Sequence, residues 1–416
     1  MLKTQTLILL ALLCAAGPLS AQSGSPRRVK ADINFLAADA REGRGVGTAG
    51  LDAAADYVAQ EFARIGLSQP WGNGYFQDFT IDSTAAMAAH TGIGGAAVKN
   101  VVGLLPGRGP FAGQVVVLGA HYDHLGRGGM GSLDPDSLGV IHNGADDNAS
   151  GTAALLEAAR LLRGRLQGDR RTIVFVAFTA EESGLIGSSY YVQHPVLSND
   201  STIAMINFDM VGRLRAGRLL ALGAGTAPEF PPLLDSLNAG YGFDLEASGD
   251  GWGRSDQSSF YGAKIPVVHF FTDLHSDYHR VSDDPQTIDV EGLAKVAAYV
   301  VDLTTALATR PDRLTYVDIP QPVMASGSRA SLGTIPDMAS SPGGVRLTGV
   351  REGSPAALAG ILGGDIITRI GDYEIANLND MQNALTSYKG GDVVTIVVRR
   401  DEEQMSFTVT LGGGRG

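Results

Sequence analysis

Apolar runs and helical patterns alternate along the first three quarters of the chain. Four runs are almost continuously apolar, as strands buried on both faces are. They are "GQVVVLGAH" (113–121), "RTIVFVAFTA" (171–180), "STIAMINFDM" (201–210) and "IPVVHFFT" (265–272). Residues 149–166 and 289–307 have apolar positions at helical spacing. This alternation predicts an α/β domain whose sheet is covered by helices on both faces.

The regions on either side of these runs complete the predicted organisation. Residues 49–67 also show helical spacing, and we expect this helix to pack on the sheet as an outer layer. Residues 311–330 carry three prolines and no sustained period, which predicts a linker or an ordered crossover. Short strands then alternate with two short helices over residues 331–413, which predicts a second, small β-rich domain.

The N-terminus predicts a cleaved export signal. Residues 1–21 combine one early lysine, an apolar run of about a dozen residues and a small-residue stop. The run is shorter than the roughly 20 residues that span a bilayer, which disfavours the alternative of a membrane anchor. We therefore expect cleavage after Ala21, a mature larger domain over residues 22–310, and a periplasmic or extracellular location.

Charge and cysteine content narrow the possible ligands and partners. The formal net charge of −12 argues against a nucleic-acid partner, because binding phosphates requires a basic face. The chain has one cysteine, Cys14, which lies inside the predicted export signal. The mature protein would therefore have no thiolate, and a metal site would have to use His, Asp and Glu.

Acids and imidazoles follow the predicted buried strands, where an open α/β sheet binds its ligands. These are His121, Asp123 and His124 after the first strand, Glu181 and Glu182 after the second, Asp209 after the third, and His275, His279 and Asp283 after the last, with Asp146 and Asp147 before a helix. Taken singly, Asp147 could be a helix-capping acid, His279 a solvated loop residue and Asp209 a turn residue.

Taken together, these residues favour a metal site. Uncompensated charges at the edge of a buried sheet cost several kcal/mol each, and few lysines or arginines are adjacent in sequence. Two imidazoles and three carboxylates, one of them bridging, suit a pair of zinc ions. Glu181 and Glu182 lie where a strand gives way to a turn, so one can ligate while the other acts as general base beside a metal-bound water.

Five motifs in this order resemble the M28 family of co-catalytic zinc aminopeptidases, and the resemblance covers most of residues 30–308. The motifs are "GAHYDHLG", "NGADDNASG", "TAEESGLIGS", "INFDMVGR" and "SDYHRVSDD". The resemblance implies a three-layer αβα sandwich with a mixed, mostly parallel sheet, and two Zn²⁺ ions. It implies that His121 and Asp209 bind one ion, that Glu182 and His279 bind the other, and that Asp147 bridges them.

The resemblance also implies roles for residues that are not ligands. Glu181 would be the general base, Asp123 would orient the His121 ring, and Tyr278 would stabilise the oxyanion. The Asp147–Asn148 peptide is expected to be cis. His124 and His275 lie outside the ligand positions and are expected at the surface or beside the ligands. Ser255 and Asp256 are expected to border the substrate pocket, and Gln257 stands where many members have histidine.

The C-terminal domain resembles a PDZ domain. "SLGTIPDM" (331–338) is similar to its carboxylate-binding loop, and "GSPAALAGILGGDIITRIGD" (353–372) to its most recognisable core stretch. The resemblance implies that backbone N–H groups of the loop receive a peptide C-terminus while the peptide adds a strand to the sheet. In the alternative, this domain only packs against the peptidase or shields its entrance.

Together, the motifs predict an exported di-zinc metallo-aminopeptidase that acts on peptides with a free N-terminus. One alternative is a carboxypeptidase or a glutaminyl-cyclase-like enzyme on the same fold. The full two-metal ligand set disfavours the cyclase, and no arginine stands out in the sequence as a holder of a substrate carboxylate. The other alternative is a non-catalytic protein that binds peptides through the PDZ-like domain.

Overall fold

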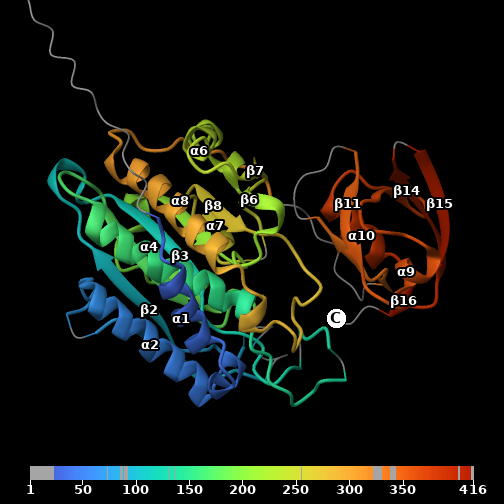
Figure 1. Cartoon of the computed structure of the whole chain (residues 1–416), viewed down its shortest axis with the longest axis horizontal. Helices are drawn as coiled ribbons and strands as arrows, with labels where there is room; N and C mark the ends of the chain where they lie inside the picture. The colour runs from blue at the N-terminus through green and yellow to red at the C-terminus, as the bar shows by residue number, and fades with distance from the viewer. Residues whose placement is uncertain are drawn as a thin grey trace, which may run out of the picture.

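The computed structural model of the chain describes residues 23–413, except for residues 73, 85–87, 89–91, 130, 135, 254, 322–329, 338–342 and 402. In this part of the chain, a larger and a smaller domain lie side by side, each built around its own sheet (Figure 1). Three predicted features lie wholly or partly outside the described residues: the export signal over residues 1–21 with Cys14, the expected linker at residues 322–329, and the expected carboxylate-binding loop at Met338.

The larger domain is built on one eight-stranded mixed sheet of order β1-β2-β4-β3-β5-β8-β6-β7. Its four central strands, β4, β3, β5 and β8, run parallel, with antiparallel pairings on both sides. The strands are β1 (Phe76–Thr80), β2 (Ala97–Leu105), β3 (Val115–His121), β4 (Thr172–Phe178), β5 (Thr202–Phe208), β6 (Arg218–Leu222), β7 (Asp244–Ser248) and β8 (Val267–Phe271). The carboxyl ends of the central strands therefore meet at one edge of the sheet.

Helices cover both faces of this sheet (Figure 1). One face carries α1 (Pro26–Leu36), α2 (Ala49–Ile65), α4 (Gly151–Arg165), α6 (Phe230–Asn238) and α8 (Val290–Thr309), and the other carries α5 (Ile186–Gln193) and α7 (Gln257–Gly262). Alternate residues of β3 belong to the hydrophobic cores on the two faces of the sheet. Val116 and Leu118 belong to the first core, and Val115 and Val117 belong to the second. This arrangement confirms the three-layer αβα sandwich with a mixed, mostly parallel sheet.

Two helices illustrate how the layers are held. The helix expected over residues 49–67 is α2, and Phe62 on it packs against Phe175 of β4, so it is an outer layer as predicted. By length and composition, α8 could cross a membrane. However, 72% of its 18-residue apolar stretch is buried inside the fold. Its apolar surface therefore contributes to the core, with Leu293, Val300 and Leu307 all buried.

The smaller domain has a sheet of order β10-β11-β12-β14-β15, to which β13 is added beside β12. Its elements are β9 (Ala330–Ser331), β10 (Thr334–Pro336), β11 (Val345–Val350), α9 (Pro355–Ala359), β12 (Ile366–Ile370), β13 (Tyr373–Glu374), α10 (Leu378–Thr386), β14 (Val393–Arg400), β15 (Glu403–Thr410) and β16 (Gly412–Gly413). Leu347, Ile367 and Ile396 are buried in its core. β10 lies at the edge of the described sheet.

The segment after α8 is held against the larger domain before it reaches the smaller one. The hydroxyl of Tyr261 donates to the carbonyl of Val317 (2.9 Å), and Nε1 of Trp252 donates to the carbonyl of Ile319 (2.8 Å). The two domains also contact each other directly, because Nη2 of Arg218 on β6 lies 2.8 Å from both carboxylate oxygens of Asp337.

Candidate metal centre

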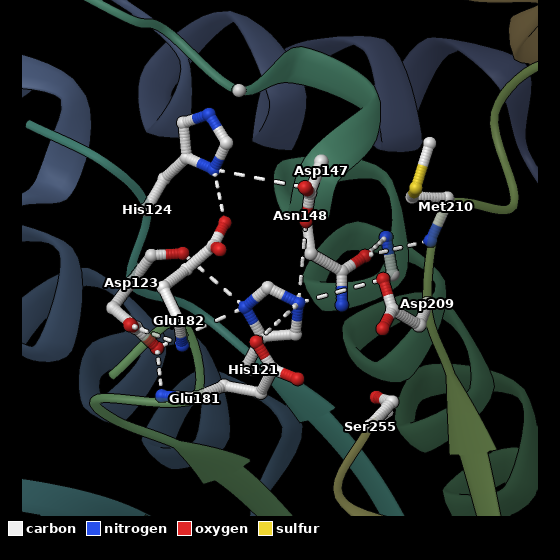
Figure 2. Close-up of polar contacts among 12 residues, drawn as sticks. His121, Asp123, His124, Asp147, Asn148, Glu181, Glu182, Asp209, Met210 and Ser255 are labelled. Atoms are coloured by element: carbon white, nitrogen blue, oxygen red, sulfur yellow. Dashed lines mark hydrogen bonds and ion pairs between the residues drawn. The ribbon is translucent and has the colours of Figure 1, made fainter. Parts of the chain in front are cut away.

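Three neighbouring strands deliver charged side chains to one edge of the sheet. His121 ends β3, Glu181 and Glu182 follow β4, and Asp209 follows β5. Because β4, β3 and β5 are adjacent and parallel, these side chains converge at their carboxyl ends (Figure 2). Loops add the rest of the cluster: Asp147 from the turn before α4, and Tyr278 and His279 from the loop after β8.

The first group of possible metal ligands surrounds His121. Its Nε2 lies 3.3 Å from Oδ1 of Asp147 and 3.4 Å from Oδ1 of Asp209. Its Nδ1 faces the backbone carbonyl of Asp123 at 3.3 Å, so a tautomer protonated on Nδ1 leaves the Nε2 lone pair facing the two carboxylates. The three side chains could hold one metal ion.

The second group surrounds the other oxygen of Asp147. Nε2 of His279 lies 3.1 Å from Oδ2 of Asp147 and 3.2 Å from Oε2 of Glu182, while its Nδ1 is held by the carbonyl of Gly131 at 2.8 Å. Asp147 is therefore shared between two histidine–carboxylate groups. The sequence-predicted ligands His121, Asp147, Glu182, Asp209 and His279 are all brought together.

A third imidazole, His124, also faces the second group. Its Nδ1 lies 2.7 Å from Oε1 of Glu182 and 3.9 Å from Oδ2 of Asp147, so proximity alone also allows His124, Asp147 and Glu182 to hold an ion (Figure 2). We favour His279, because its Nε2 is close to both carboxylates, whereas His124 is close to Glu182 alone. His124 is fully buried beside the ligands, which is the second of the two positions expected for it.

The cluster holds more buried negative charge than its described cationic neighbours balance. Oδ1 of Asp209 is buried and accepts no hydrogen bond from a described residue. Asp256 is also fully buried, and neither of its carboxylate oxygens has a hydrogen-bond partner among the described residues. Burial raises the pKa of Asp256 to about 7, with Asp123 and Asp209 adding to the effect and His121 opposing it. This donor set fits divalent cations bound by nitrogen and oxygen ligands.

The pKa values of the adjacent acids Glu181 and Glu182 are shifted in opposite directions. Burial raises the pKa of Glu181 well above its usual value, and Glu182 and other nearby acids add to this against the opposing effect of His121. For Glu182, burial acts in the same direction, but His279 and the hydrogen bonds from His124 and His279 outweigh it and bring the pKa to about 2. Oε2 of Glu181 lies 4.0 Å from Nε2 of His121, and no described residue donates a hydrogen bond to its carboxylate.

Asp123 fixes the turn that presents these two acids. Its carboxylate accepts the backbone N–H groups of Glu181 (3.0 Å) and Glu182 (3.4 Å). Its Oδ1 is 3.8 Å from Nδ1 of His121, farther than its own backbone carbonyl at 3.3 Å. In this structure the carbonyl of Asp123 is therefore the nearer partner of the His121 ring.

Tyr278 packs directly on a candidate ligand. Its ring stacks on the imidazole of His279, with ring centroids 3.8 Å apart. Burial raises the pKa of Tyr278 well above its usual value, and the carboxylates of Asp147 and Glu182 raise it further, so the hydroxyl stays protonated and can donate a hydrogen bond.

A layer of buried acids behind the site holds the Asp147 turn. Asp283 accepts the backbone N–H groups of Asp146 (2.9 Å) and Asp147 (3.0 Å). Asp146 contacts Nε2 of His275 at 3.0 Å, so His275 is also buried beside the site and is not a surface residue. The Asp147–Asn148 peptide is cis, as the resemblance implies.

Sequence reasoning gave no role to Arg44, which also supports the site. Its guanidinium is fully buried and donates to the carbonyls of Leu36, Tyr122, Asn143 and Gly144. It thereby ties the loop after β3 to the loop before Asp147. The only signal in the sequence is an arginine between glycines in "EGRGVG", which indicates a tight turn but no partner.

Comparisons with known protein families match both domains. Residues 100–304 match the model of peptidase family M28, and residues 325–411 match that of the PDZ domain. Aminopeptidase YwaD of Bacillus subtilis is 36% identical over 221 residues, which are 50% of this chain and 43% of that protein. Leupeptin-inactivating enzyme 1 of Streptomyces exfoliatus is 30% identical over 256 residues, covering 61% of this chain and 50% of that enzyme. The chain thus spans about half the length of these curated relatives.

Solved structures support the fold of the larger domain. A Zn-dependent exopeptidase from Parabacteroides distasonis aligns with a TM-score of 0.56 at 22% identity, over 68% of this chain and 99% of that one. A glutaminyl cyclase from Bacteroides thetaiotaomicron aligns with a TM-score of 0.55 at 20% identity, over 68% and 98%. With both family models matched, residues 100–304 belong to an M28 peptidase domain and residues 325–411 to a PDZ domain.

Proposed function

We propose that this protein is an exported di-zinc aminopeptidase that removes N-terminal residues from peptides. The observation that carries the proposal is the Asp147 carboxylate, whose two oxygens face two separate histidine–carboxylate groups. Relatives named as aminopeptidases, including leucine aminopeptidase 1 of Trichophyton rubrum at 29% identity, support the reaction class. The export signal predicted over residues 1–21 is the basis for proposing a location outside the cytoplasm.

In this proposal, five side chains hold two zinc ions. His121 and Asp209 would hold one, His279 and Glu182 the other, and Asp147 both. Imidazole and carboxylate ligands suit zinc, although such sites also accept other divalent metals. Bound zinc would polarise the scissile carbonyl and lower the pKa of a coordinated water.

The chain's own residues would then move the proton and stabilise charge. Glu181 would take a proton from the attacking water on its carboxylate and pass it to the leaving amine, a role that its raised pKa and its lack of described hydrogen-bond donors both suit. The carboxylate of Asp123 would hold Glu181 in place by accepting the backbone N–H of Glu181. The protonated hydroxyl of Tyr278 would donate a hydrogen bond to the developing oxyanion.

The test compares the wild type with Glu181→Gln on leucine p-nitroanilide and on peptides with free or acetylated N-termini. Loss of the base should lower kcat by about 10²- to 10⁴-fold while the bound metal is retained. Equal rates for the two proteins would remove Glu181 from the base role. Hydrolysis of acetylated peptides at the same rate as free ones would contradict aminopeptidase action and favour the carboxypeptidase alternative. Metal analysis of both proteins gives the zinc content independently of activity.

A further inference from the structure

The candidate ligand His279 has a left-handed backbone conformation, with a φ angle of 57°. Residues with a side chain rarely adopt this conformation, because the Cβ atom then crowds the following carbonyl oxygen. Such a residue persists only where the surrounding contacts hold it. The position of this ligand therefore depends on partners outside its own loop.

A short segment of the loop after β3, residues 131–134, supplies these partners. The carbonyl of His279 accepts the backbone N–H of Leu133 at 2.9 Å, and the carbonyl of Gly131 lies 2.8 Å from Nδ1 of the His279 ring. When Nδ1 carries the proton, Nε2 keeps its lone pair on the side of the two carboxylates that it faces. The segment thus holds both the backbone and the ring of the ligand.

Asp134 uses both of its carboxylate oxygens on the two residues that follow His279. Its Oδ1 accepts a hydrogen bond from Nη1 of Arg280 at 2.8 Å, and its Oδ2 accepts the backbone N–H of Val281 at 2.9 Å. The side chain of Asp134 is only 17% exposed, so these charged hydrogen bonds are partly shielded from water. The carboxylate therefore fixes the turn directly after the left-handed residue.

The other histidine of the candidate metal centre is held in a different way. His121 ends β3, where it pairs with Phe178 of β4, and its carbonyl accepts the hydroxyl of Thr152 at 2.8 Å. None of these contacts involves residues 131–134. A change at Asp134 should therefore disturb one of the two histidine positions and leave the other in place.

We propose that Asp134 is a positioning residue for His279 and decides whether the zinc ion of His279 and Glu182 is retained. This inference rests on the proposed di-zinc site and adds a residue outside the five ligands that sets its occupancy. Without the carboxylate, the turn after His279 loses two of its hydrogen bonds, and the left-handed conformation is no longer held. The protein would then keep only the ion of His121 and Asp209.

The experiment measures the zinc content of the full-length protein. Metal-free protein is dialysed against zinc buffered by nitrilotriacetate, at the lowest free concentration that fills both positions of the wild type. We expect Asp134→Ala to hold about one ion per chain there, because its affinity at the His279 position falls by about 10- to 100-fold. Asp134→Asn keeps an oxygen for the N–H of Val281 and should lose less affinity. Asp136→Ala, at an exposed position of the same loop, is the matched control and should hold two ions.

A second background shows where Asp134 acts. His279→Ala removes the ligand itself and leaves the residues of the other position. In this background, Asp134→Ala should change the affinity for the remaining ion by less than about twofold, because the two substitutions act on the same position. A purely structural role of Asp134 would weaken binding in both backgrounds.

The outcomes separate this inference from the di-zinc proposal. If the wild type and Asp134→Ala both hold two ions with equal affinity, the inference is wrong and the di-zinc proposal stands. The inference is also wrong if Asp134→Ala weakens the remaining ion of His279→Ala by 10-fold or more. If the wild type never holds more than one ion, both fail. Far-UV circular dichroism shows whether Asp134→Ala is folded, and if it is not, Asp134→Asn decides between the same outcomes.

Discussion

The carboxylate of Asp283 accepts the backbone N–H of Asp147 at 3.0 Å, so a residue outside the candidate ligand set holds the one ligand that both histidine groups share. Asp283 is fully buried and also accepts the N–H of Asp146. The orientation of the Asp147 carboxylate thus depends on the peptide that Asp283 fixes. Partners of this kind commonly influence metal affinity as strongly as they influence activity.

We expect Asp283→Asn to weaken metal binding by about 10- to 100-fold, because the N–H groups of Asp146 and Asp147 both donate to Oδ2 of Asp283, and a neutral amide oxygen accepts them more weakly than a carboxylate. Competition with a chromogenic zinc chelator measures this loss without an activity assay. Asp318→Asn, at an exposed position on the connecting segment, is the control and should match the wild type. Unchanged zinc affinity in Asp283→Asn would limit Asp283 to a role in folding.

Tyr278→Phe should separate stacking from hydrogen bonding. Phenylalanine keeps the ring that stacks on His279 but removes the hydroxyl that would face the oxyanion. We expect kcat to fall by about 10- to 1000-fold with zinc content unchanged, as when a single oxyanion donor is removed. Steady-state kinetics measure kcat, and metal analysis measures the zinc content of the variant. A wild-type kcat in Tyr278→Phe would leave this tyrosine with a packing role.

The buried Asp256 predicts how the metal-free protein responds to pH. Its pKa of about 7 in the folded protein is above the value of about 3.9 in an unfolded chain, so the folded state keeps a proton that the unfolded state has lost. Its contribution is complete below the unfolded pKa and is lost as the pH rises through about 7. The unfolding midpoint of chelator-treated protein should therefore fall by several degrees between about pH 5 and pH 8.

Asp256→Asn provides the comparison for that measurement. It removes the ionisation, so the midpoint of the chelated variant should depend less on pH over the same range. Adding zinc to the wild type should raise the midpoint most at the higher pH, because the cations then offset the charge of the buried carboxylates. A midpoint of the chelated wild type that rises steadily from pH 5 to pH 8 would show that Asp256 ionises freely in the fold.

The parts of the fold that could be predicted are those buried on both faces. β3, β4, β5 and β8 are continuous apolar runs, because both cores require apolar side chains. The edge strand β7, "DLEAS", was missed because it is only partly buried and includes two acids. β1, "FQDFT", has the same character, and a short polar strand resembles a loop in sequence.

The residues of the candidate metal centre were also only partly predictable from the sequence. The five candidate ligands and Glu181 could be predicted because they follow recognisable strands and occur in ordered motifs. For His124, the choice between the surface and a buried place beside the ligands stayed open, because sequence spacing does not fix the direction of a side chain after a strand has ended. The position of Arg44 depends on contacts with distant loops, which a local pattern does not encode.

The shared carboxylate of Asp147 also has a consequence for how the two ions would be loaded. A single negative charge would serve both positions, so filling one would change the electrostatic potential at the other. The two binding events would then be thermodynamically linked, and a calorimetric titration of the zinc-free protein should resolve a tighter and a weaker step. Half-loaded protein would be a distinct species with its own properties, and preparations with one equivalent of metal need not behave as an average of empty and full protein.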